Sequence, residues 1–450
     1  MPRVAYSLLC VVLAPLAAAP LSRPYTVDSY DVRVQVDMPD RRLNGEVTIR
    51  LHSIAESAVS ALEFDAGGMA IASVTEGDRR QYFERKGRSL TVVLTTPIQT
   101  DEHRTITIRY QAATAAGLKF FADQIYTTAV SDWLPCNDLP TERSTLHLTL
   151  AAPADMKAAA SGQLTTTSAG SSEWQLDSPA APGWFGFAVG RFDENTSEAD
   201  GVQLRVLGAS KDVFDPTAAA NRHLAAKTGK KYPGATYTQV FVQGVVTHPM
   251  AGGLALLPEA DAQGLPKQSE ALRDLAGAMA QQWYGIGIGS RESGDVWLNE
   301  ALPAFLADSF VDDRLGQANY DVQVERAQDI YNRLRAEGKD GPLADIEWNP
   351  QAPAKDSLAV VKGVAFLNLL NEFDDEFWNG LRLFTADVWG KTASSEDFEH
   401  ALGAVPRGAN AASGKRRPRK KNVKPLTNAN TLDKLFNTWV YGIATGKTKK

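Results

Sequence analysis

The six histidines are the first residues whose type could support catalysis or metal binding, and they are His52, His103, His147, His223, His248 and His400. No two of them follow the His-x-x-x-His spacing, which places two imidazoles on one face of a helix around zinc. His147 alternates with Leu146 and Leu148, so it is expected on the outer face of a strand. Only His248, directly before Pro249, is expected near a binding groove.

Other chemical signatures are weaker still. Once the segment that contains Cys10 is set aside, Cys136 is the only cysteine, so an intrachain disulfide is excluded. The glycine-rich run GIGIGSRESG at 285–294 lacks the spacing and the preceding strand of a phosphate loop, and it is expected to connect two helices. A Ser-His-Asp triad has no local signature in this chain.

Charge and composition restrict the possible partners. The chain has 450 residues, a formal net charge of −6 and 44% hydrophobic residues, which is typical of a globular protein. A run of basic residues lies within 415–424, so the rest of the chain is more acidic than the total suggests. An acidic body argues against nucleic acid as a partner. The basic run is expected to be a solvated loop, with adhesion to an anionic surface as the alternative.

The first residues, MPRVAYSLLCVVLAPLAAAP, are typical of a secretory signal. Arg3 supplies the positive charge, residues 4–16 the short apolar core, and residues 17–19 the small-residue exit. We therefore expect residues 1–19 to be a signal peptide and the protein to be exported to the periplasm or the extracellular space. An uncleaved N-terminal anchor is the alternative, and no other stretch is apolar enough to span a membrane.

The periodicity of the apolar residues divides the remaining chain. Alternation with period two recurs through residues 20–193 and predicts an antiparallel β domain. Residues 194–403 combine two strand-like segments with expected helices at 270–283, 300–316, 320–336, 357–373 and 396–402. Residues 404–430 are predicted to be a basic low-complexity insertion, and 431–450 a C-terminal helix and tail.

Several segments, in this order, resemble the gluzincin aminopeptidase family, peptidase family M1. They are DWLPCNDLPTERSTLHLTLAAP, KKYPGATYTQVFV, AGGLALLPE, QQWYG, DVWLNEALPAFLADSF and VVKGVAFLNLL. The resemblance implies an α+β fold, in which an N-terminal antiparallel β saddle domain precedes a thermolysin-like, mainly helical catalytic-type domain. It also implies zinc as the cofactor of active members.

The resemblance further implies which residues occupy the catalytic positions. The family binds zinc with two His on one helix and a Glu that follows the second His after 18 intervening residues, and a Glu between the two His acts as general base. Here the two His positions hold Gly277 and Gln281, the general-base position holds Ala278, and only Glu300 keeps a ligand. Val360 stands where the family has its transition-state Tyr, and Ala255 where it has the Glu that holds the substrate amine.

We therefore expect an inactive homologue with no catalytic residues, no bound metal and no cofactor. The expected partner is a peptide or protein in the cleft between the domains, where the groove candidates are Gly252, Gly253, Leu254, Ala255 and Leu256. The competing view is that these segments are kept only to pack the core. An active zinc aminopeptidase and an unrelated chemistry in the same cleft are the alternative functions. The oligomeric state and any remaining role of Glu300 are open at this level.

Overall fold

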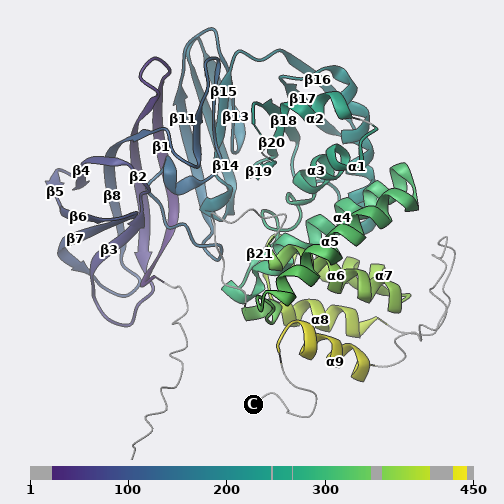
Figure 1. Ribbon diagram of the computed structural model, residues 1–450. Coiled ribbons are helices and arrows are strands. Elements are labelled where there is room, and N and C mark those ends of the chain that lie inside the picture. Colours follow the sequence, from purple (N-terminus) through teal and green to yellow (C-terminus); the bar gives the residue numbers. More distant parts are fainter. Residues whose placement is uncertain (1–22, 245–246, 266, 346–356, 406–428, 443–450) are drawn as a thin grey trace, which may run out of the picture.

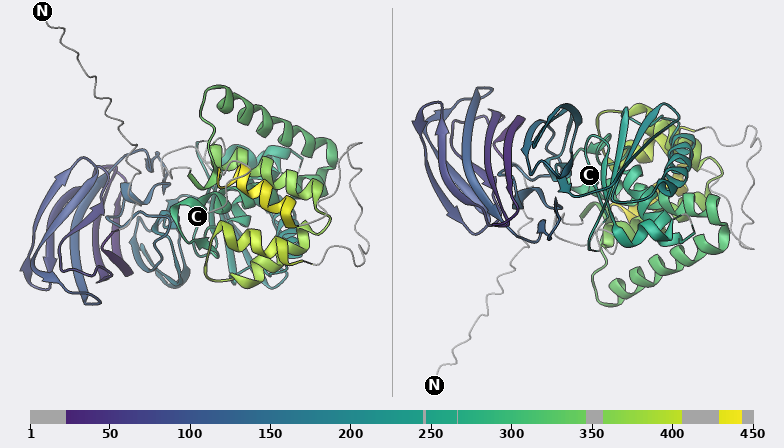
Figure 2. Two further views of the ribbon diagram at one scale, coloured as in Figure 1. Left: turned by 90° about the horizontal axis from the view of Figure 1, so that it is seen from below. Right: turned by 90° about the horizontal axis from the view of Figure 1, so that it is seen from above.

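The computed structural model describes residues 23–244, 247–265, 267–345, 357–405 and 429–442. The expected signal peptide, residues 1–19, lies outside these ranges, and so does most of the expected basic insertion, at 406–428. The described chain forms two lobes side by side, a β lobe and a helical lobe that has a sheet of its own (Figures 1 and 2). None of the described helices is long and apolar enough to cross a membrane.

The β lobe is built on one large sheet. Its strands, in spatial order, are β13 (Gln163–Ser168), β14 (Ser171–Ala180), β11 (Ser144–Ala151), β1 (Tyr25–Asp37), β2 (Arg42–Ser53), β8 (His103–Ala113), β4 (Ala70–Glu76) and β5 (Arg79–Arg80). Along β1 the apolar side chains of Tyr30, Val32 and Val34 are buried while their neighbours reach solvent, because successive side chains of a strand point to opposite faces.

The sheet is mainly antiparallel, as the sequence pattern predicted, but one pair of strands is parallel. The strands β1 and β11 run in the same direction, with Tyr30 opposite Leu146 and Val32 opposite Leu148. Parallel neighbours need a long crossover connection, and the chain between β8 and β11 provides one. It runs through a second sheet before it returns.

Two smaller sheets complete the β lobe. The three-stranded sheet consists of β3 (Val59–Asp65), β7 (Ser89–Ile98) and β6 (Tyr82–Lys86). The four-stranded sheet consists of β12 (Lys157–Ala160), β15 (Phe187–Gly190), β10 (Gln124–Thr127) and β9 (Leu118–Phe120). The apolar core of the β lobe also includes Leu207, Val240 and Met250, which come from the helical lobe, so one continuous core joins the two.

The helical lobe begins with a five-stranded sheet. Its order is β16 (Glu194–Ala199), β17 (Val202–Leu207), β18 (Thr236–Val242), β20 (Leu254–Pro258) and β19 (His248–Met250). The three inner strands are parallel, and the two outer strands are antiparallel to their neighbours. A short pair, β21 (Gly289–Ser290) and β22 (Thr392–Ala393), lies among the helices.

Helices form the rest of this lobe. The described ones are α1 (Phe214–Thr228), α2 (Glu259–Gly264), α3 (Ser269–Ala280), α4 (Val296–Leu315), α5 (Gln317–Ala336), α6 (Leu358–Phe373), α7 (Phe377–Asp387), α8 (Ser395–Ala404) and α9 (Ala429–Trp439). The sequence pattern did not predict α1, α2 and α7, and it extended α3 three residues too far. It correctly predicted that residues 285–294 connect two helices, which are α3 and α4.

The buried carboxyl group of Asp138 makes the stability of the β lobe depend on pH. Asp138 lies just before β11, and burial raises its pKa to about 7, with Asp65 adding repulsion. A carboxyl group with a raised folded-state pKa binds more protons in the folded than in the unfolded state between pH 4 and 7, approximately. Its contribution to stability is therefore present at low pH and is lost as pH rises through about 7.

We expect Asp138→Asn to raise the melting temperature by a few degrees at pH 8 and by much less at pH 5, because the variant never has to bury a carboxylate. Differential scanning calorimetry at the two pH values measures the difference. The exposed Asp78 provides the control, since Asp78→Asn should have the same small effect at both. An equal effect of Asp138→Asn at pH 5 and pH 8 would contradict the role given to this carboxyl group.

Candidate functional site

The helices α3 and α4 carry the positions that the sequence placed at the catalytic centre. Gly277 and Ala278 lie in the last turn of α3, and Gln281 directly follows this helix. Glu300 lies in the second turn of α4. Both helices are central to the lobe and largely buried, so all four positions are fixed by the packing of the core.

Two tryptophans anchor the chain at the ends of these helices. Trp283 is fully buried, and its indole Nε1 donates a hydrogen bond to the carbonyl of Lys230 at 3.0 Å. Trp297 is buried in the first turn of α4, where its Nε1 donates to the hydroxyl of Ser395 at 3.0 Å. The motif tryptophans therefore pack the core and tie neighbouring segments to it.

A buried ion pair joins the two helices. Arg273 on α3 donates to the carboxylate of Asp308 on α4, with Nε and Oδ1 2.6 Å apart. The Asp308 side chain is fully buried, and the pKa of Arg273 is raised by this partner in spite of its own burial. The pair thus fixes how α3 lies against α4.

The three positions at the end of α3 offer almost no metal-binding atoms. Gly277 has no side chain, and a Cβ built there would meet only the Ala307 methyl group, at 3.7 Å, which is an ordinary contact. Ala278 is buried and apolar. Gln281 contributes a neutral amide whose Oε1 is buried and accepts no hydrogen bond within the described chain. This oxygen lies over Gly285, where a Cβ would come within 2.6 Å of it.

Glu300 is the one carboxylate at the site. It is half-buried, and burial raises its pKa to about 7. Among the residues that the structure describes, none forms an ion pair or a hydrogen bond with this carboxylate.

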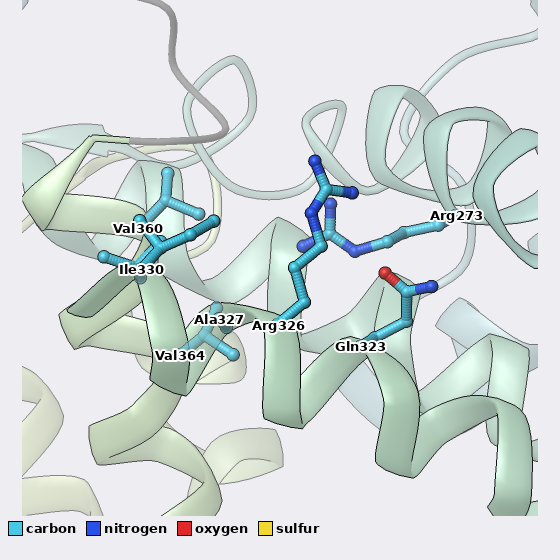
Figure 3. Close-up of a pocket in the computed structure, with 8 residues that line it drawn as sticks. Arg273, Gln323, Arg326, Ala327, Ile330, Val360 and Val364 are labelled. Carbon is cyan, nitrogen blue, oxygen red and sulfur yellow. The ribbon is translucent and has the colours of Figure 1, made fainter. Parts of the chain in front are cut away.

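Val360 lies in the first turn of α6 and lines a small cavity. The cavity has a volume of about 20 Å³, which is on the order of one water molecule. Figure 3 shows the side chains of Arg273, Arg326 and Gln323 close together, with Val360 and Ile330 across from them among the residues that line the cavity. Val360 provides no hydroxyl group, and the cavity is too small for a peptide.

The groove candidates lie in a glycine turn and in an inner strand of the five-stranded sheet. Gly252 and Gly253 form a tight turn with φ of 76° and 82°, and a Cβ on Gly253 would lie 2.2 Å from the carbonyl oxygen of Thr236. Leu254, Ala255 and Leu256 belong to β20, which pairs with β18 on one side and with β19 on the other. Their side chains are buried. Within the described residues, β20 thus has a paired neighbour on both sides at Leu254, Ala255 and Leu256, so a peptide could add to it there only by displacing β19.

The edge strand on this side of the sheet is β19. It places His248 at the sheet edge, half-buried, and burial lowers the pKa of this histidine to about 4, so it is neutral at pH 7. The strand itself offers few backbone groups, because Pro249 has no N–H and the carbonyl of Met250 already accepts from Gln282 Nε2 at 3.0 Å. Strand addition along β19 would therefore be short.

A larger hollow lies elsewhere, between the lobes. It has a volume of about 410 Å³ and opens where the inner strands β17, β18 and β20 end. In open sheets of parallel strands, ligands bind outside these carboxyl ends. Its wall is polar, and it is lined from the β lobe by residues 123–124 and 191–193 and from the helical lobe by Asn195, Gly208, Ala209, Ser210, Phe241, Gln243 and Glu259.

Comparisons with known proteins agree with this architecture. A family model described as the Peptidase M1 N-terminal domain matches residues 26–178, which is most of the β lobe. A search of curated proteins gave no significant match. The β lobe is thus a Peptidase M1 N-terminal domain, and the resemblance inferred from the sequence motifs is confirmed.

Solved structures extend the similarity to both lobes. The M1 zinc metallopeptidase from Deinococcus radiodurans superposes with a TM-score of 0.68 at 20% identity, covering 84% of this chain and 90% of that one. A mutant of it bound to a Tyr-Ser-Ala substrate gives 0.66 at 20% identity over 84% and 91%. Yeast LTA4 hydrolase in complex with Bestatin gives 0.70 at 15% identity over 85% and 65%. The chain has the α+β fold of M1 metallopeptidases.

The residues present do not fit the zinc ion that this fold implies. A structural or catalytic zinc site needs at least three side-chain ligands drawn from His, Cys and carboxylates. At the end of α3, Gly277 has no side chain, Ala278 has only a methyl group, and Gln281 has a neutral amide. Helix α4 adds the single carboxylate of Glu300. No chemical step can therefore be assigned to a metal at this place.

Sequence reasoning missed two features of the site. The edge strand β19 was missed because it is only three residues long and contains a proline, so it shows no alternation. The pairing of Arg273 with Asp308 was missed because the two residues lie 35 positions apart. Their positions became meaningful only once α3 and α4 were packed together.

Proposed function

We propose that this protein is an M1 aminopeptidase-like protein without peptidase activity, whose remaining function is to bind a partner. The donor set at the end of α3 carries this proposal, since Gly277, Ala278 and Gln281 provide neither two imidazoles nor a general base. Val360 likewise provides no donor for a developing oxyanion. An active zinc aminopeptidase and an unrelated hydrolase activity are the alternatives that an assay must exclude.

The size of the missing contribution supports inactivity. A bound zinc lowers the pKa of its water from about 15.7 to about 7. At about 1.36 kcal/mol for each unit, this amounts to roughly 12 kcal/mol of nucleophile activation. The single half-buried carboxylate of Glu300 does not replace it.

The hollow between the lobes is the surface that supports binding best. Three carboxylates, Asp123, Asp193 and Glu259, line it, while its one cation, Arg191, is paired with Asp155 outside it at 2.8 Å. An acidic hollow with Phe192 and Phe241 in its lining favours a basic segment of a peptide or protein. One structural neighbour was solved with a tripeptide, which supports a peptide ligand by analogy.

We predict that the full chain does not hydrolyse aminoacyl amides, with or without one equivalent of added zinc, and that a broad panel of ester and amide substrates is also left intact. A fluorogenic aminopeptidase assay measures the first and a hydrolase screen the second. Turnover that a chelator abolishes would disprove the proposal.

A variant that restores ligands provides the matched control. In Gly277→His/Gln281→His the two imidazoles and Glu300 provide a three-ligand set, and a Cβ at position 277 makes only an ordinary contact with Ala307. We expect this variant to bind one more equivalent of zinc than the parent, measured by inductively coupled plasma mass spectrometry. No additional zinc would show that the helices do not hold these positions in register.

Binding in the hollow should depend on charge. We expect a Lys/Arg-rich peptide to bind at least several-fold more tightly than an Asp/Glu-rich peptide of equal length, and Asp193→Asn/Glu259→Gln to remove most of this preference. Fluorescence anisotropy at low and high salt measures the affinities for both peptides. Glu84→Gln on the distant strand β6 is the control and should leave the preference unchanged. Equal affinities for both peptides would contradict the proposed ligand class.

Export to the periplasm or the extracellular space is also part of the proposed function. It rests on the pattern of residues 1–19 in the sequence. The chain expressed with its own N-terminus in a secreting bacterial host should be recovered outside the cytoplasm, and mass spectrometry should show the loss of about 19 residues. Intact chain retained in the cytoplasm would contradict it.

A further inference from the structure

A cluster of two histidines and one aspartate lies on the large sheet of the β lobe, far along the chain from the peptidase positions. It consists of Asp28 on β1, His52 on β2 and His103 on β8, three strands that are direct neighbours in the sheet (Figure 1). One ligand atom of each residue lies within 4.8 Å of the others. We propose that these three side chains form a binding site for a zinc-type divalent transition-metal ion.

The register of the sheet brings the two imidazoles together. His52 and His103 are directly opposite each other in the antiparallel pair β2–β8, where facing side chains lie closest. Their ring centroids are 4.9 Å apart, with the ring planes inclined by 43°. Both residues lie at strand ends, so the rings are fixed by the sheet while their edges remain open to solvent.

A β-bulge directs the aspartate toward them. The register of β1 against β2 shifts between Val27 and Ser29, which leaves Asp28 as the extra, unpaired residue. Bulges of this kind re-aim a side chain. The Asp28 carboxylate reaches both histidines, with Oδ1 2.8 Å from His52 Nδ1 and Oδ2 3.0 Å from His103 Nδ1.

The distances between the Asp28 oxygens and the two histidine nitrogens suit a metal ion in place of the hydrogen-bonding protons. A tetrahedral zinc with bonds of 2.0–2.2 Å separates neighbouring ligand atoms by about 3.3 Å. The present contacts are only a few tenths of an ångström shorter, so small side-chain rotations would admit the ion. Imidazole and carboxylate are ligands that zinc, copper and nickel accept, and three protein ligands leave a position for water.

Access and charge are also favourable. The side chains of Asp28, His52 and His103 are 31%, 27% and 59% exposed, so an ion from solution can reach them. The nearest cation along the chain, Arg104, is already paired with Glu102 at 2.8 Å and with Glu76 at 3.5 Å. Within the described contacts, the Asp28 carboxylate thus pairs only with the two histidines.

The test uses the full chain without a polyhistidine tag. Zn²⁺ is titrated at pH 7.5 in competition with a chromophoric chelator, and Co²⁺ is added separately to record its visible spectrum, which responds to coordination geometry. We expect one equivalent of either metal to bind the parent. We expect His103→Gln and Asp28→Asn each to weaken Zn²⁺ binding at least about tenfold, because replacing even a residue outside the ligand set lowers metal affinity by that factor.

Two control variants show whether the metal is held by this cluster or by another part of the chain. His147 also faces an aspartate on the same sheet, Asp31, at 3.4 Å, but as a pair without a third ligand, so His147→Gln should leave metal binding unchanged. Glu300→Gln should leave it unchanged as well, because the two sites are independent. Unfolding is followed in parallel: added zinc should raise the melting temperature of the parent but not of His103→Gln.

The outcomes are distinct. Loss of binding in the Asp28 and His103 variants, with His147→Gln unaffected and metal-free melting temperatures unchanged, supports the site. Absence of binding by the parent at micromolar Zn²⁺, or binding that persists in both variants, overturns it and leaves only a hydrogen-bonded link between three strands. Binding lost only in Glu300→Gln would overturn it in favour of the peptidase position.

Discussion

The packing of α3 against α4 is the constraint on which the helical lobe depends. In M1 metallopeptidases, by the resemblance described above, a zinc ion joins two histidines of one helix to a glutamate of the next. Here the buried pair of Arg273 and Asp308 joins the corresponding helices without a metal. Removing one partner of such a pair leaves a buried charge uncompensated, at a cost of about 3–5 kcal/mol. The helices are thus held in place by interactions that do not need the catalytic ligands.

The segments that resemble the family also contain residues with a packing role of their own. Gly285 has a φ of 106°, and a Cβ there would approach Trp184 to 2.9 Å. Gly363 faces α4 so closely that a Cβ would lie 2.5 Å from that of Ala301. Lys362 is buried and donates to Asp340 at 2.8 Å. Each of these residues has a structural role in the described fold, so its retention is not evidence of catalysis.

Features set by residues close together in the sequence could be predicted, whereas features set by contacts between distant residues could not. The period-two strands and the strong apolar stripe of α3 were recovered because local spacing encodes them. The helix α1 was missed since its buried face consists of alanines together with polar residues such as Thr217 and Asn221, which do not stand out as an apolar stripe.

Features that depend on which strands pair, and in which register, could not be predicted from the sequence. The parallel pairing of β1 with β11 and the full pairing of β20 follow from which strands become neighbours, which one sequence does not state. The cluster of Asp28, His52 and His103 likewise joins three strands and depends on a bulge. The spacing of histidines along the chain indicates ligands on one helix but is uninformative across a sheet. The positions Gly277, Ala278, Gln281 and Glu300 were assigned only through the resemblance to the family, and the structure places them at the end of α3 and in α4.

The shared core between the lobes has a consequence for folding. Leu207, Val240 and Met250 of the helical lobe lie in the apolar cluster of the β lobe, and the backbones of Gly162 and Gly252 meet too closely for a side chain between them. Neither lobe can separate without exposing apolar surface to water. The β lobe and the five-stranded sheet therefore belong to one cooperative unit, and a chain cut between the lobes would expose an apolar face prone to self-association.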